Sequence, residues 1–112
     1  PAGHRVLLAI VEVEGVEELK DLSNQLRKKM GPGVIALVRP GGAPDILVVV
    51  EGVDAALANA GSIVSAGATA IGGRGGGKPN MGQGRGAEGG DAALAIQAMA
   101  AALGLARSGA DA

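Results

Sequence analysis

The chain has 112 residues, of which 47% are hydrophobic, and its formal net charge is −1. This length predicts one domain with its own core, and the near-neutral charge excludes a uniformly basic nucleic-acid binder. The absence of Cys, Phe, Tyr and Trp excludes disulfides, thiolate metal sites and the stacking of bases on aromatic rings. We find no signal peptide and no apolar run long enough to cross a membrane, which predicts a cytoplasmic setting. Because the sequence begins at Pro1 without an initiator Met, we expect it to be a piece of a longer protein.

The first segment, Arg5 to Val13, predicts a strand, and its continuous apolar run predicts a central strand that is buried on both faces. Val16 to Met30 predicts a helix, because its large apolar residues recur every three or four positions. Acidic residues open this segment, and Arg27 to Lys29 close it, as the helix dipole favours. A partner-binding role for that basic cluster is the second interpretation. Gly31 and the proline after it end the helix.

Two more strands are predicted next, at Val34 to Val38 and at Ile46 to Val50. The Pro-Gly-rich turn from Pro40 to Pro44 predicts that they pair antiparallel. The first strand, the helix and the second strand together predict a right-handed crossover unit. A mixed sheet follows from these two pairings.

The second half predicts shorter helices. Asp54 is expected to cap a helical turn through Leu57, and Ser62 to cap a second short helix that carries Ile71. Asp91 is expected to cap an alanine-rich helix over residues 92–103. The predicted fold class is therefore α/β: a small mixed β-sheet packed with three to four helices. All of it forms one domain spanning residues 1–112, with a glycine-rich loop at 72–90 and a frayed tail at 104–112.

The glycine-rich run from Gly72 to Gly86 carries three cations, Arg74, Lys78 and Arg85. Glycine loses the most conformational freedom on folding, so such a run stays ordered only when neighbouring structure or a partner compensates. Exposed amides with cations between them favour an anionic partner, most often a phosphate backbone. A flexible linker or a disordered RNA-binding tail is the competing interpretation. The apolar segments on both sides favour a loop within the domain.

Enzymatic motifs do not fit this run. Gly72 to Lys78 is one residue short of the phosphate loop of nucleotide hydrolases, and Pro79 stands where that loop needs Ser or Thr. Gly84 to Gly89 matches the dinucleotide-binding fingerprint by letter but lacks a strong apolar strand before it. Glu88 and Asp91 are interpreted as a counter-charge for the neighbouring arginine and as a helix cap. We find no catalytic constellation.

The run resembles the C-terminal signature of alanyl-tRNA synthetases, Gly-Gly-x-Gly-Gly-Gly-x-Pro-x-Met-Ala-Gln-x-Gly-Gly. It departs from that signature at Gly82, where alanine is usual, and at Arg85, where the first of two glycines is usual. The order of predicted elements also resembles the C-terminal (C-Ala, DHH-associated) domain of that family over nearly the whole chain. The matching residues are Gly72, Gly73, Gly75, Gly76, Gly77, Pro79, Met81, Gln83 and Gly86.

The resemblance implies a tRNA-binding domain that contacts the tRNA elbow, works with the rest of the synthetase chain and helps couple aminoacylation with editing. It also implies a possible homodimer. It implies ATP, magnesium and zinc for the parent ligase only, and no cofactor, metal site or catalytic residue within this fragment. Two alternatives remain: a substrate-binding subdomain of a DHH-type phosphoesterase, and a dimerisation module built on the alanine-rich helix. The residues predicted to bind tRNA are Gly72, Gly73, Arg74, Gly75, Gly76, Gly77, Lys78, Asn80, Gln83 and Arg85.

Overall fold

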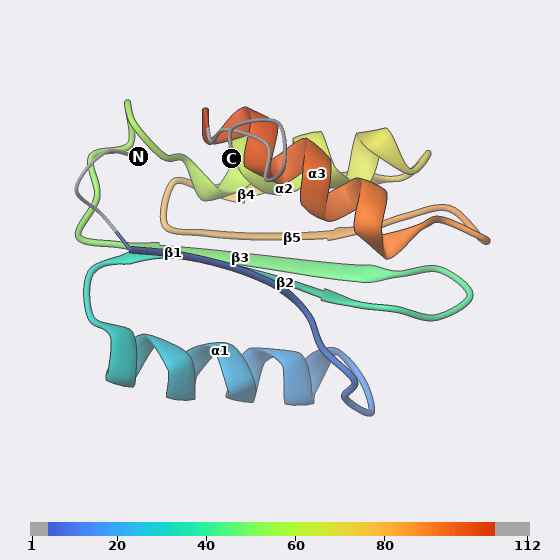
Figure 1. Ribbon diagram of the computed structural model, residues 1–112, viewed down its shortest axis with the longest axis horizontal. Helices are drawn as coiled ribbons and strands as arrows, with labels where there is room; N and C mark the ends of the chain where they lie inside the picture. Colours follow the sequence, from blue (N-terminus) through green and yellow to red (C-terminus); the bar gives the residue numbers. More distant parts are fainter. Residues whose placement is uncertain (1–4, 105–112) are drawn as a thin grey trace, which may run out of the picture.

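The computed structural model describes residues 5–104. They form one five-stranded mixed sheet with a helix on one face and two helices on the other (Figure 1), which confirms the predicted fold class. The tail expected at 104–112 lies outside the described residues apart from Gly104. None of the described helices is long and apolar enough to cross a membrane. The elements are β1 (Arg5–Ile10), α1 (Val16–Met30), β2 (Gly33–Arg39), β3 (Asp45–Glu51), α2 (Ala60–Ala70), β4 (Arg74–Lys78), β5 (Met81–Arg85) and α3 (Ala92–Ala102).

The strand order is β1-β2-β3-β5-β4. β1 pairs parallel with β2 and β2 pairs antiparallel with β3, as predicted. The prediction that the first strand is central is wrong, because β1 lies at the edge of the sheet and ends at Ile10. Its apolar run has another cause: Val6 and Leu8 contact the core beneath α2 and α3, whereas Leu7 and Ala9 contact the core beneath α1.

Helix α1 forms over the predicted residues. Gly31 ends it with a φ of 75°, in the left-handed region that favours glycine, and donates its backbone N–H to the Arg27 carbonyl. The helix buries Leu19 against the sheet, where Ile35, Leu37 and Leu47 form a small core.

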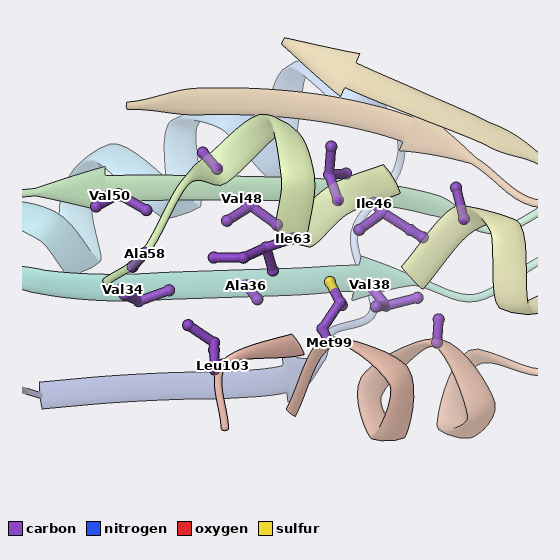
Figure 2. Packing of buried hydrophobic residues seen from close by; sticks show 14 of the residues in the cluster. Val34, Ala36, Val38, Ile46, Val48, Val50, Ala58, Ile63, Met99 and Leu103 are labelled. Carbon is purple, nitrogen blue, oxygen red and sulfur yellow. The ribbon is translucent and has the colours of Figure 1, made fainter. Parts of the chain in front are cut away.

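The larger core lies between the other face of the sheet and helices α2 and α3. Figure 2 shows Ile63 from α2 and Met99 from α3 pointing at a row of valines on β2 and β3. With no Phe, Tyr or Trp in the chain, this core depends on close approach of the backbones. An added Cβ on Gly67 of α2 would lie 2.7 Å from Cγ of Met99. Small residues therefore bring the two helices together.

Two expectations for the second half of the chain are wrong. Asn59, not Ser62, caps α2: its side chain accepts a hydrogen bond from the Ser62 N–H at 3.1 Å, and Ser62 lies inside the helix. The stretch expected as a glycine-rich loop at 72–90 instead contains the β4–β5 hairpin. The Asp91 cap is confirmed, because its carboxylate accepts from the Ala93 N–H at 2.9 Å.

Candidate nucleic-acid interface

The glycine-rich run folds into a hairpin at one edge of the sheet. β4 and β5 pair antiparallel and are joined by Pro79 and Asn80, and β5 pairs with β3. The Val50 N–H donates to the Asn80 carbonyl and the Ala60 N–H to the Pro79 carbonyl, both within 2.9 Å, so the turn is held by β3 and by the start of α2. Because side chains alternate along a strand, the hairpin has two chemically different faces.

The first is the packed face, made of Gly75, Gly77, Gly82 and Gly84, which lies under α2. An added Cβ on Gly82 would lie 2.7 Å from Cγ1 of Val64 and 2.8 Å from the carbonyl oxygen of Ala60. Since real Cβ atoms do not approach that closely, glycine is required here by the nearness of the helix backbone. The glycines on this face therefore serve packing of α2 on the sheet.

The second is the open face, which carries Arg74, Lys78 and Arg85, all exposed. It lies on the side of the sheet that α1 covers elsewhere, over β2 and β3. An added Cβ on Gly76, in the middle of this face, would meet nothing within 4 Å. Gly76, Lys78 and Gln83 also line a shallow depression of about 260 Å³. This face is free to meet a large partner.

A row of charges crosses the sheet at one end of the open face. On neighbouring strands, Arg74 lies directly opposite Arg85, and Arg85 lies directly opposite Asp45. Asp45 in turn lies opposite Arg39. Asp45 has a side chain that is only 12% exposed and lies 2.9 Å from Arg39 but 3.8 Å from Arg85. Like charges directly opposite each other on a sheet are destabilising. Asp45 forms salt bridges with Arg39 and Arg85, whereas Arg74 has no salt-bridge partner among the described residues, so this end of the face favours a bound anion.

At the other end of the open face, Lys78 lies opposite Met81, next to the turn. Among the described residues neither Arg74 nor Lys78 has a salt-bridge partner. The two side chains stand four positions apart on one strand, which is about 13 Å. They are therefore suited to separate anionic groups on an extended ligand.

The structure brings the three predicted cations and Gln83 to one face. Gly72 and Gly73 precede β4, and Gly73 donates its N–H to the Ala68 carbonyl at the end of α2. Asn80 lies in the exposed turn. The expected pairing of Glu88 with Arg85 is absent among the described residues, where the counter-charge is Asp45. Sequence reasoning missed Asp45 because the adjacency of β5 and β3 was not predicted. The one available signal was its spacing, since Asp45 stands two positions before Leu47 and therefore on the same face of the strand.

The fold matches a solved structure, that of the C-Ala domain from Aquifex aeolicus alanyl-tRNA synthetase. The TM-score is 0.71, with 22% sequence identity over 85% of this chain and 86% of that one. No protein-family model matches the chain. The architecture therefore defines a C-Ala-type domain.

Curated relatives point to the same family by sequence. Alanine–tRNA ligase from Nitrobacter winogradskyi is 43% identical over 98 residues, which cover 82% of this chain and 11% of the relative. Alanine–tRNA ligase from Anaeromyxobacter dehalogenans is 40% identical over 87 residues, which cover 77% of this chain and 10% of the relative. The chain belongs to the alanyl-tRNA synthetase family, as a C-Ala-type domain. It spans about a tenth of the length of these relatives, which give no support to the phosphoesterase alternative.

Proposed function

We propose that this domain binds tRNA through the open face of the β4–β5 hairpin, contacts the elbow of the tRNA and thereby helps couple aminoacylation with editing in a cytoplasmic alanyl-tRNA synthetase. The observation that carries the proposal is the gathering of Arg74, Lys78 and Arg85 on one exposed face, where, among residues 5–104, only Arg85 has a salt-bridge partner. The domain itself performs no chemistry in this account. ATP, magnesium and zinc are used elsewhere in the ligase.

In this proposal the cations and the exposed backbone contact the RNA. Most of the hairpin glycines, which the sequence predicts to lie in a tRNA-binding loop, instead allow α2 to pack closely on the hairpin. Gly76 is exposed on the open side of the edge strand, where a phosphate can approach the backbone. Gly82 and Gly84 are directed at α2 instead. Because the chain has no Phe, Tyr or Trp, recognition depends on charge and shape, as suits a folded RNA.

The test is a titration of tRNA against this 112-residue chain at several salt concentrations. Neutralising about three phosphates predicts a slope of log affinity against log salt near −2 to −3. Arg74→Ala combined with Lys78→Ala is expected to reduce that slope by about 2 and to weaken binding about tenfold or more at physiological salt.

The matched control is Lys28→Ala combined with Lys29→Ala, which removes the same charge from exposed positions at the end of α1. It is expected to leave the slope unchanged. Equal losses in both double variants would show that binding follows net charge alone and would contradict the assignment to the open face. A minihelix of acceptor stem and T arm, which lacks the D loop and therefore the complete elbow, is expected to bind more weakly than the whole tRNA, and equal affinity would overturn contact with the assembled elbow.

A further inference from the structure

A cleft lies beside the open face, at the end of the hairpin opposite the charged row. It has a volume of about 290 Å³ and is lined by Asn24, Arg27, Glu51, Gly52, Asn80 and Met81, with β3 behind them. Small-molecule pockets begin at about 300 Å³, so this cleft is sized for one small flat group and not for a helix.

The rim of the cleft is held in place by contacts between three elements. Arg27 of α1 lies 3.3 Å from the Glu51 carboxylate at the end of β3. Asn24 stands three positions before Arg27 and so shares its side of the helix. On the other side, the backbone bond from Val50 to Asn80 fixes the hairpin turn against β3. The hairpin turn is therefore fixed against β3 on one side of the cleft, and the half-exposed pair of Arg27 and Glu51 forms the other side.

The lining offers an unusual set of hydrogen-bonding groups for so small a space. Arg27 contacts one carboxylate oxygen of Glu51, and among the described residues the other oxygen has no hydrogen-bond partner. The side-chain amides of Asn24 and Asn80 can each donate and accept. Met81 is 39% exposed and supplies a polarizable apolar surface. Together these groups suit a flat heterocycle that carries N–H donors and a carbonyl oxygen side by side on one edge. The N–H donors would meet the carboxylate of Glu51, and the carbonyl oxygen would accept from an amide or from Arg27.

Among the standard bases, guanine has that edge. Its ring N–H and its exocyclic amino group lie side by side and match a carboxylate acceptor, and its carbonyl oxygen accepts from an amide or a guanidinium. Adenine and cytosine would instead direct a ring acceptor at the carboxylate, and uracil has one ring N–H between two carbonyl oxygens. The position of the cleft adds a phosphate contact, because Lys78 is the cross-strand partner of Met81.

We propose that this cleft receives one unstacked guanine of the RNA that lies on the open face, with Glu51 as the residue that selects it. The inference rests on the proposed function, since it takes the RNA on the open face as the source of the base. Arg27 is then a positioning residue, which orients the carboxylate.

Guanosine 5′-monophosphate and adenosine 5′-monophosphate are the probes for the test, because they share the phosphate and differ in the base. Each is titrated into the isotope-labelled 112-residue chain, and shifts are followed at the side-chain amides of Asn24 and Asn80 and at the Gly52 N–H. We expect the guanine nucleotide to bind about tenfold more tightly than the adenine nucleotide, in line with one bidentate contact. Glu51→Gln is expected to remove that preference, whereas Glu17→Gln, the same charge change at an exposed site on α1, is expected to keep it.

Equal shifts with both nucleotides, or a preference that survives Glu51→Gln, would overturn the proposal. A parallel tRNA titration separates the two hypotheses. If tRNA binds through Arg74 and Lys78 but the guanine nucleotide shows no preference, the cleft assignment fails and the proposed function stands. If the guanine nucleotide is preferred but tRNA does not bind, the proposed function fails, and with it the RNA origin of the base.

Discussion

The two faces of the β4–β5 hairpin have the same backbone and opposite roles. The packed face consists of glycine because the backbone of α2 lies directly on it, with Ala60 and Val64 as the nearest contacts of Gly82. The open face carries long cations and, at Gly76, empty space. A glycine-rich sequence that suggests a flexible loop is thus half packing surface and half open surface, and the open half is the one that we propose binds tRNA. The lesson is that the alternation of glycine with Arg, Lys and Gln matters more than the glycine content.

The largest expected effect is on the packed face. Gly82→Ala is expected to lower the free energy of unfolding by about 3 kcal/mol, because the new methyl group would overlap the Ala60 carbonyl oxygen of α2. Gly76→Ala, the matched change on the open face, is expected to stay within about 0.5 kcal/mol of the parent. Urea denaturation of both variants measures this. Equal destabilisation would contradict the division into two faces.

The next effect concerns the charged row that anchors the open face to the sheet. Asp45→Ala is expected to cost about 2 kcal/mol, because it leaves the guanidinium of Arg39, 2.9 Å away, without its carboxylate partner. Arg85→Ala is expected to cost less than about 0.5 kcal/mol, because that side chain is 68% exposed and its oxygen partner is 3.8 Å away. Thermal unfolding of the two variants measures the difference between the Arg39–Asp45 pair and the Arg85–Asp45 pair. A larger loss of stability for Arg85→Ala than for Asp45→Ala would contradict this ranking.

The smallest expected change in stability is in the pair of cations that we assign to binding. Arg74→Ala combined with Lys78→Ala is expected to shift the free energy of unfolding by less than about 0.5 kcal/mol, since both side chains are exposed and lack salt bridges among the described residues. Calorimetry on the same samples used for tRNA titration measures it. A large loss of stability would mean that these residues serve the fold, and the binding result would then lose its meaning.

Much of the first half of the fold could be predicted from the sequence. The apolar spacing of α1 and the stop at Gly31 are local signals, and the structure keeps both boundaries. The position of β1 could not be predicted in the same way. An apolar run such as Val6 to Ala9 indicates that both faces are covered, but not how many strands lie beside it, and here helices cover a strand that has one neighbour.

The hairpin was beyond local reasoning for a different reason. Glycine has a low strand propensity, so the pairing of β4 and β5 depends on tertiary contacts with β3 and α2 that no local pattern encodes. The exposure of Arg74 and Lys78 could be predicted because long cations are rarely buried without partners. The place of Asp45 beside Arg85 could not, since it follows from the strand order.

The most direct test of the account is a photo-crosslinking comparison between the two faces of the sheet. A photoreactive side chain at Gly76 would stand on the open face, where an added Cβ meets nothing within 4 Å. The same group at Leu94 would stand on the exposed side of α3, which packs on the other face of the sheet. We predict that labelled tRNA crosslinks to position 76 and not to position 94. Crosslinking at position 94 without crosslinking at position 76 would contradict the central claim.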